Sequence, residues 1–128
     1  MIEINNLTNF AVDKKLLKGV AKKVLKGENR EIENISIAFV SSDEIKKLNQ
    51  KYRKKNKATD VLSFGKTLDF KSDTAEIIIC PEVVKKNKDK LEKMVIHGVL
   101  HILGYDHEKT KKQAEEMEKK QEKYLSKI

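Results

Sequence analysis

The chain contains very little of several residue types that would indicate particular classes of protein. A single cysteine, Cys80, excludes an intramolecular disulfide framework. No apolar stretch approaches the length of a membrane-spanning helix, and residues 1–4 do not resemble the start of a secretory signal peptide. With one proline and five glycines, the sequence has no Pro- or Gly-rich linker, and it contains no internal repeat. We therefore expect residues 1–128 to form a single domain and the protein to be cytoplasmic.

Charged residues, in contrast, are abundant and unbalanced. The 128 residues include 28 Lys and Arg against 20 Asp and Glu, which gives a net charge of +8. Such an excess favours polyanionic partners, nucleic acid first and an anionic membrane surface second. Surface networks of Lys and Glu in a heat-adapted protein would explain the density of charge, but they explain the positive excess less well. The most basic stretch is 46–57, which has seven Lys or Arg residues and no acid, although a solvated helix end would also explain most of these lysines.

Hydrophobic periodicity predicts alternating strands and helices in the order βαβαββ, followed by further helices. The apolar and β-branched segments expected to form strands are 2–4, 35–39, 60–64 and 75–80. The segments with helical spacing are 13–27, 42–52, a short helix from Pro81, 91–103 and the tail 108–128. This order indicates a small α+β domain with a four-stranded mixed β-sheet packed with helices.

Local capping signals support these helix boundaries. Asp13 and Ser41 are placed to accept hydrogen bonds at the starts of the first two helices. Gly27 is expected to end the first helix. The charged tail has a thin stripe of less polar side chains that predicts packing against the rest of the domain, namely Ala114, Met117, Gln121 and Leu125.

All three histidines fall within one eleven-residue window, HGVLHILGYDH. His97 and His101 are four residues apart, so on a helix they lie one turn apart on the same face. Gly104 follows where the helix would end on a left-handed residue, after which the chain can bring His107 back toward the first two histidines. Because this spacing matches the frame H-x-x-x-H-x-x-G-x-x-H of one class of zinc hydrolases, we predict that the three histidines bind a metal.

Three imidazole ligands leave one position open on a tetrahedral metal, which is typical of catalytic rather than structural zinc, although a fourth protein ligand is not excluded. Zinc is the expected ion, one per chain, and nickel or another divalent ion would suit the same ligands. Cys80 is interpreted as a small core residue and not as a fourth ligand.

The general base of such a site is less clear from the sequence. The zinc hydrolase class carries a glutamate directly after the first histidine, whereas this chain has Gly98. Asp60, Glu76 and Asp106 are candidates for a base or for a carboxylate that orients a histidine. We interpret Glu76 as a residue at the end of a strand and Asp106 as a turn residue, since acids are common at such positions.

Three blocks of the sequence resemble the YbeY family of metal-dependent endoribonucleases. They are LNQKYRKKNKATDVLSF at 48–64, EIIICPEVV at 76–84 and HGVLHILGYDH at 97–107, and the likeness covers nearly the whole chain. Two positions depart from the family pattern: Gly65 stands where proline is usual, and Ala75 where glycine is usual. Both departures concern the loop between two strands and not a predicted ligand.

The resemblance implies a zincin-like metal site on a helix and its following turn, with His97, His101 and His107 as zinc ligands and with Arg53 and His97 as catalytic residues. It implies a single-strand-specific, metal-dependent endoribonuclease that acts in ribosomal RNA processing, notably maturation of the 3′ end of the small-subunit RNA, and in ribosome quality control. The implied partners are ribosomal RNA and the ribosomal subunit or proteins associated with it. No membrane partner and no specificity for DNA are expected.

In this scheme the Arg53 guanidinium would hold two phosphate oxygens and stabilise charge in the transition state. The neighbouring lysines would attract RNA without sequence preference; they are Lys51, Lys54, Lys55 and Lys57. Two other functions remain open: a metallopeptidase-like hydrolase, against which Gly98 and the basic stretch argue, and a non-catalytic ribosome-associated RNA-binding factor. The binding factor would hold a structural metal in a closed site.

Overall fold

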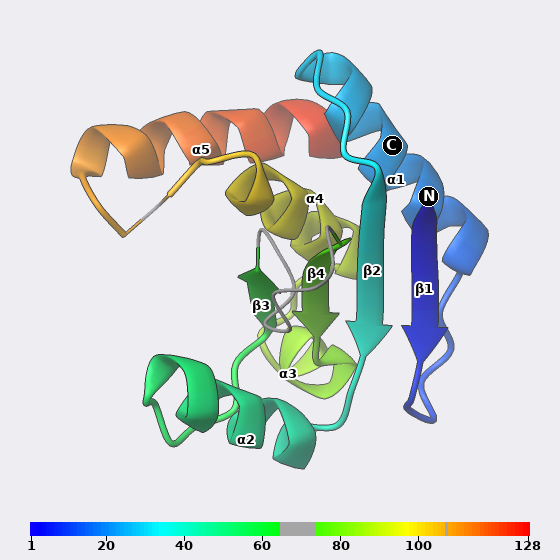
Figure 1. Cartoon of the computed structure of the whole chain (residues 1–128), viewed down its shortest axis with the longest axis vertical. Coiled ribbons are helices and arrows are strands. Elements are labelled where there is room, and N and C mark those ends of the chain that lie inside the picture. The colour runs from blue at the N-terminus through cyan, green and yellow to red at the C-terminus, as the bar shows by residue number, and fades with distance from the viewer. Residues whose placement is uncertain (65–73, 107) are drawn as a thin grey trace.

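The computed structural model describes residues 1–64, 74–106 and 108–128, and this part of the chain has an α+β fold with a four-stranded mixed sheet and five helices (Figure 1). The elements follow the predicted order βαβαββ and then helices. In chain order they are β1 Ile2–Asn6, α1 Lys14–Gly27, β2 Asn34–Phe39, α2 Ser42–Arg53, β3 Val61–Phe64, β4 Thr74–Ile79, α3 Pro81–Lys86, α4 Leu91–Ile102 and α5 Lys111–Leu125.

The strands lie in the order β1-β2-β4-β3, in which the first three are parallel and β3 is antiparallel to β4. One row of paired residues crosses the sheet from Ile4 through Ile37 and Ile77 to Ser63. Paired residues point to the same face, so this row is apolar and buried through β1, β2 and β4. It ends on β3 with the polar side chain of Ser63.

Helices α1 and α4 cover the face of the sheet on which this row lies, and α5 packs against α4 (Figure 1). The alternation along β2 explains the burial, because Ile35, Ile37 and Phe39 are fully enclosed while the residues between them are partly exposed. α5 contributes Met117 and Tyr124 to this core. A smaller apolar cluster on α2 and the strands of the opposite face contains Val40, Ile45, Leu62 and Cys80.

Several capping predictions are confirmed. The side chain of Asp13 accepts a hydrogen bond from the backbone N–H of Leu16 (3.1 Å), and Ser41 accepts one from Glu44 (3.2 Å). Gly104 follows α4 with a φ of 108°, the left-handed conformation that its position predicted.

Helix α1 ends at Gly27, as the sequence predicted, but Gly27 does not adopt a left-handed conformation. Gly27 is still helical, and the left-handed residue that follows the helix is Asn29, with a φ of 54°. Close packing gives a further reason for glycine at position 27, because a Cβ there would lie 2.5 Å from Cε1 of Tyr124. The aromatic ring from α5 therefore packs directly on the backbone of α1.

Cys80 is fully buried as predicted, and burial raises the pKa of its thiol. Ala75 is buried on β4, whereas Gly65 lies outside the described residues. Among the described residues, none of the helices combines the length and hydrophobicity that a membrane crossing requires.

Candidate active site

A cleft of about 500 Å³ lies between the C-terminal part of α2, strand β3 and the face of α4 that carries His97 and His101. Arg53, His97 and His101 all line it, together with Asp60 and Asp106. The sequence separates Arg53 from the two histidines by more than forty residues, and the fold brings them to one surface. The third predicted ligand, His107, lies outside the described residues.

His97 and His101 lie one turn apart on α4, both partly exposed to the cleft. Their ring centroids are 6.3 Å apart and the ring planes are inclined by 38°. Nδ1 of His97 lies 3.0 Å from Oε1 of Gln121, within hydrogen-bond distance. A neutral imidazole that is protonated at Nδ1 carries its lone pair on Nε2, which is the nitrogen a divalent metal would bind.

The donor chemistry of this histidine pair fits a metal such as zinc, which takes imidazole nitrogen readily. Within 1–64, 74–106 and 108–128, no group of three His, Cys, Asp or Glu side chains is arranged to hold an ion. A site formed by these two imidazoles alone would therefore be incomplete, and the sequence motif predicts His107 as the further ligand.

Packing of α4 on the sheet explains why glycine, and not glutamate, follows His97. The position faces the sheet, and a Cβ on Gly98 would lie 2.7 Å from Cγ2 of Ile77. Ile77 is completely buried, so its methyl group has little room to move away. Close packing of α4 on β4 thus excludes any larger side chain at position 98 without a shift of the helix.

Arg53 is the last residue of α2, and its side chain extends across the cleft toward the segment that follows α4. Its Nη2 lies 2.9 and 3.0 Å from the two carboxylate oxygens of Glu108. The exposed fractions of the two side chains are 36% and 51%, so water and ions can reach the pair. The contact demonstrates that this guanidinium can bind two oxygens of one anionic group.

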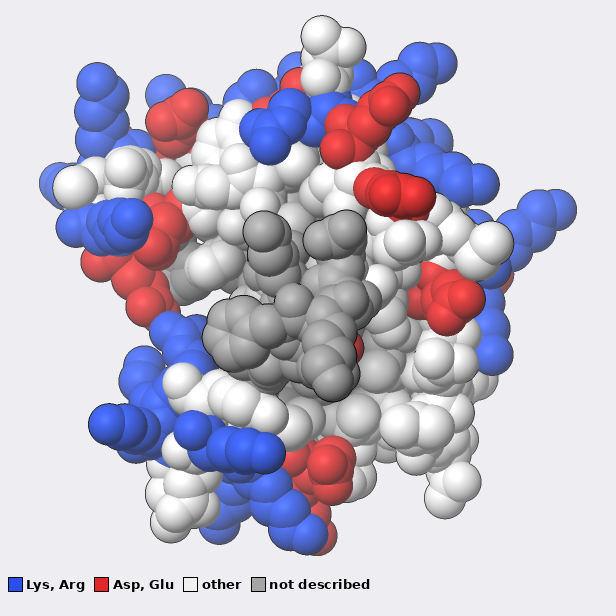
Figure 2. Space-filling model, in the orientation of Figure 1, with Lys and Arg blue, Asp and Glu red and all other residues white. Residues whose placement is uncertain are grey.

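The segment after α2 holds the basic residues beside the cleft. Lys54 adopts a left-handed conformation that ends the helix, and Lys55 and Lys57 line the cleft. Asn49 is buried and its Nδ2 donates to the backbone carbonyl of Lys57 (3.0 Å), which fixes this segment against α2. Lys and Arg side chains gather over the α2 region at the lower left of Figure 2.

Of the three candidate carboxylates, two line the cleft and one lies on β4. Asp60 lines the cleft, and its Oδ1 accepts hydrogen bonds from the backbone N–H of Val61 (2.8 Å) and from Thr59. Asp106 also lines the cleft and accepts from the backbone N–H of Glu108 (2.8 Å), which is consistent with a turn role. Glu76 lies on β4 and is not among the described residues that line the cleft.

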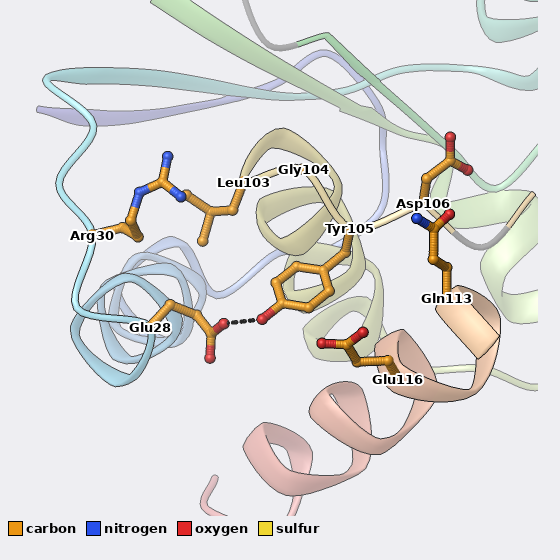
Figure 3. A pocket seen from close by; sticks show the side chains of 8 residues that line it. All are labelled: Glu28, Arg30, Leu103, Gly104, Tyr105, Asp106, Gln113 and Glu116. Atoms are coloured by element: carbon orange, nitrogen blue, oxygen red, sulfur yellow. Dashed lines mark hydrogen bonds between the residues drawn. The ribbon is translucent and has the colours of Figure 1, made fainter. Parts of the chain in front are cut away.

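A second pocket, of about 360 Å³, lies on the other side of the turn that follows α4 (Figure 3). Its central feature is Glu28, which accepts hydrogen bonds from the hydroxyl groups of Tyr105 and Tyr124 and from Lys120. Figure 3 shows Tyr105 extending from the α4 turn toward Glu28 at the end of α1. The network joins α1, the turn after α4, and α5.

These contacts shift the titration of the groups involved. Burial alone raises the pKa of Glu28, but hydrogen bonds from Tyr105, Tyr124 and Lys120 outweigh it, so the pKa lies below its ordinary value. The hydrogen bond to Glu28, together with burial, raises the pKa of Tyr105 to about 12. Burial and the contact with Glu28 also raise the pKa of Tyr124.

Sequence reasoning missed two residues that contact the predicted site. Gln121 was assigned to the packing stripe of the tail, yet its amide oxygen accepts a hydrogen bond from His97. The sequence did indicate that Gln121 faces inward, because it lies four residues after Met117 on the same face of the helix. Glu108 carried no signal, because its contact with Arg53 joins residues that are 55 positions apart.

Comparison with known proteins gives a consistent result along almost the whole chain. A family model described as "Endoribonuclease YbeY" matches residues 3–128. A protein of that name from Thermotoga neapolitana is 38% identical over 125 residues, covering 90% of this chain and 82% of the relative. Another from Ruthia magnifica is 36% identical over 140 residues, covering 100% and 96%.

A solved structure supports the same relationship at the level of the fold. The solution structure of a protein from Thermotoga maritima matches with a TM-score of 0.64 and 34% sequence identity. The match covers 98% of this chain and 87% of that chain.

Proposed function

This chain belongs to the YbeY family of endoribonucleases, and from that premise we propose that it is a metal-dependent enzyme that cleaves single-stranded RNA in the cleft between α2, β3 and α4. The observation that carries the proposal is the position of Arg53 on the same cleft as His97 and His101. Hydrolysis of a phosphodiester benefits from a cation that binds the phosphate and from a metal that activates water. The cleft brings together residues suited to both tasks.

Arg53 is the phosphate-binding residue in this proposal. A guanidinium presents several N–H groups in one plane and can hold two oxygens of a phosphate, which an ammonium group does less well. The contact with Glu108 supports this role, because two oxygens of one carboxylate lie within hydrogen-bond distance of Nη2. Charge that develops on the phosphate in the transition state would be stabilised by the same group.

The metal would be held by His97, His101 and His107, with zinc as the favoured ion and nickel or another divalent ion compatible with the same ligands. When bound, such a metal supplies Lewis acidity and lowers the pKa of a water molecule toward neutrality. The chain's own residues orient the phosphate through Arg53 and supply carboxylates at Asp60 and Asp106, which are placed to exchange a proton with groups in the cleft.

The alternative of a metallopeptidase is disfavoured by Gly98. A peptidase of the related class uses a glutamate at this position to deprotonate water and to protonate the leaving amine. Here a side chain at position 98 would collide with Ile77. A phosphodiester has a better leaving group, so the reaction depends less on that carboxylate. The alternative of a non-catalytic binding factor leaves the position of Arg53 on the histidine cleft unexplained.

We further propose that the RNA is ribosomal and that the enzyme acts in the cytoplasm on the 3′ end of the small-subunit RNA and in ribosome quality control. Family membership is the main support for this substrate. The net charge of +8 and the basic residues beside the cleft are suited to binding RNA within a ribosomal particle. A ribosomal subunit or a protein bound to it would then complete the recognition of the site.

The test is cleavage of an end-labelled, single-stranded RNA that spans the 3′ end of small-subunit ribosomal RNA. Purified protein is assayed with zinc, after chelation, and after zinc is returned, and His101→Ala is purified and assayed in parallel. We expect cleavage that stops with chelator, returns with zinc and is absent from the variant. A duplex of the same sequence should be cut much more slowly.

Each other result has a distinct meaning. Cleavage that persists in chelator or in His101→Ala would contradict a metal-dependent mechanism at this site. A folded, zinc-loaded protein that binds the RNA without cutting it would support the binding-factor alternative. Cleavage of unfolded protein substrates, unaffected by an inhibitor of ribonucleases, would support the peptidase.

A further inference from the structure

The contact between α5 and α4 next to the cleft carries an inference about the histidine pair. Gln121 lies on the inward face of α5, between Met117 and Tyr124, both of which are buried. Its Oε1 lies 3.0 Å from Nδ1 of His97, in a partly buried contact between residues 24 positions apart. The amide of Gln121 is therefore held against a predicted metal ligand by α5, none of whose residues lines the cleft in the part of the chain that the structure describes.

The chemistry of this contact is directional. A side-chain amide oxygen accepts hydrogen bonds and cannot donate them, so Nδ1 of His97 must carry the proton. A neutral imidazole has one N–H, and the lone pair is then on Nε2. A hydrogen bond to the far nitrogen of a histidine is the usual means by which proteins fix the orientation and tautomer of a metal ligand.

We propose that Gln121 is a positioning residue, which holds the His97 ring and its Nδ1–H tautomer so that Nε2 is ready to bind a metal. The inference rests on the proposed metal site and adds a residue that the histidine motif does not contain. Gln121 acts through His97 and does not itself contact RNA or metal.

The surroundings of Gln121 make it suited to this role. Met117, one turn earlier, is fully buried in the main core, and the hydroxyl of Tyr124, one turn later, donates to Glu28. α5 is thus fixed on both sides of Gln121, which limits the positions its amide can take. Loss of the acceptor from α5 would remove the hydrogen bond that favours one orientation and one tautomer of the His97 ring.

Three substitutions separate this role from a general effect on packing. Gln121→Leu keeps a similar volume but removes the acceptor. Gln121→Glu keeps an acceptor and adds a negative charge, which strengthens the hydrogen bond and raises the basicity of the ring. Gln113→Leu changes an exposed glutamine on the same helix that lines the second pocket, and serves as the matched control.

Two measurements test the proposal. Long-range ¹H–¹⁵N correlation spectra of the metal-free protein at pH 8 report the tautomer of His97, and competition with a chromophoric chelator gives the affinity for zinc. We expect the Nδ1–H tautomer in the wild type and in Gln121→Glu, and a mixture in Gln121→Leu. Zinc affinity should fall roughly 10- to 100-fold in Gln121→Leu, and it should be retained in Gln121→Glu and in Gln113→Leu.

The outcomes also separate this inference from the proposed function. A wild-type His97 protonated at Nε2 would overturn the role of Gln121 without any variant having to fold. Zinc affinity of Gln121→Leu within twofold of the wild type, with an unchanged tautomer, would do the same while leaving the metal site intact. Failure of the wild type to bind zinc would overturn the metal site itself, and with it the role of Gln121 as its support.

Discussion

Arg53 and Glu108 form an ion pair whose two members come from opposite sides of the cleft. Both carboxylate oxygens of Glu108 lie within 3.0 Å of Nη2 of Arg53, and both side chains are substantially exposed. An RNA phosphate would offer the guanidinium the same kind of oxyanion. In the proposed mechanism Glu108 and the RNA phosphate compete for Arg53, and binding of RNA displaces the carboxylate.

Glu108→Gln should tighten the binding of single-stranded RNA. Exposed ion pairs contribute little, so the expected gain is about two- to fivefold in KM, which corresponds to less than ~1 kcal/mol. Glu118→Gln, an exposed carboxylate on α5, controls for the loss of one negative charge. Weaker binding in Glu108→Gln than in this control would indicate that Glu108 positions Arg53 and does not compete for it.

The candidate site was only partly predictable at the scale of residues. The spacing of His97 and His101 predicted their shared face, because helical geometry is local. The place of Arg53 came from family resemblance and not from spacing. Gln121 could be identified only as an inward-facing residue of the tail, and Glu108 not at all, because their partners depend on how α5 and the turn after α4 pack against distant elements.

At the scale of elements, α4 packs closely on β4 beside the site. Gly98 allows the two to approach, and Gly98→Ala would place a Cβ 2.7 Å from Ile77. Overpacking of this kind outweighs the gain in helix propensity, so we expect a net loss of about 1–2 kcal/mol in the free energy of unfolding. Urea denaturation followed by circular dichroism measures this loss.

Gly19 provides the matched control, since it also lies inside a helix but has open space where a Cβ would be. Gly19→Ala should raise the free energy of unfolding by about 0.5–1 kcal/mol, from helix propensity alone. Equal effects of the two substitutions would mean that α4 and β4 are not as closely packed as the structure indicates.

Glu28 joins three elements, and its titration should be visible in the stability of the protein. Its folded-state pKa lies below the ordinary value of 4.5 because Tyr105, Tyr124 and Lys120 donate to it. A depressed carboxyl pKa contributes stability that is present above the unfolded-state value and is lost as pH falls through the folded-state value. The contribution should therefore disappear in the acid range below about pH 4.5.

Glu28→Gln should lower the melting temperature at pH 7 and reduce the steepness of its fall below pH 4.5. The amide cannot ionise, so this part of the acid dependence is removed. Melting temperatures measured between pH 3 and 7 test the prediction, with Glu122→Gln as an exposed control on α5. An acid dependence in Glu28→Gln that matches the wild type would show that the network does not depend on the charge of Glu28.

Local sequence signals predicted the helices and strands well. They did not predict features that depend on packing between distant segments. Asp13 and Ser41 cap their helices because a side-chain cap needs only the next turn of chain. Gly27 was assigned to a helix end because that is the usual local reason for glycine. α1 does end there, but the ring of Tyr124, almost a hundred residues later, also requires glycine at this position, and no local pattern could reveal that contact.

At the scale of the whole molecule, the positive charge is distributed over more than the cleft. Figure 2 shows Lys and Arg over α2 and also along the upper edge and the right side of the molecule. The lysines beside the cleft should contribute mainly through the release of counterions from RNA. A plot of log affinity against log salt concentration falls as salt increases. Replacement of Lys54, Lys55 and Lys57 by Gln should make this slope less steep, by up to about 2.

A triple substitution on α1 tests whether this effect is local. Lys14, Lys15 and Lys22 are exposed on a helix that does not contribute to the cleft, and their replacement by Gln changes the net charge equally. We expect a smaller change in the salt slope from the α1 variant. Equal changes would mean that RNA contacts a much wider surface than the cleft.

The sequence predicted the fold class more reliably than it predicted the order of the strands in the sheet. The alternation of apolar residues indicated four strands and their order along the chain. It could not place β4 between β2 and β3, because strand neighbours are set by contacts between distant segments. That placement creates the cleft, since it sets β3 at the edge of the sheet beside α2 and α4.

The central claim is that Arg53 on α2 acts on the same phosphate as the metal held by the histidines of α4. The most direct test is turnover at saturating RNA for zinc-loaded Arg53→Ala, with RNA affinity measured separately. We predict that kcat falls roughly 100-fold or more, while affinity changes by no more than about fivefold. Arg53→Lys should be intermediate, because a lysine cannot hold two phosphate oxygens. A variant that binds RNA more weakly but turns over at the wild-type rate when saturated would contradict the account.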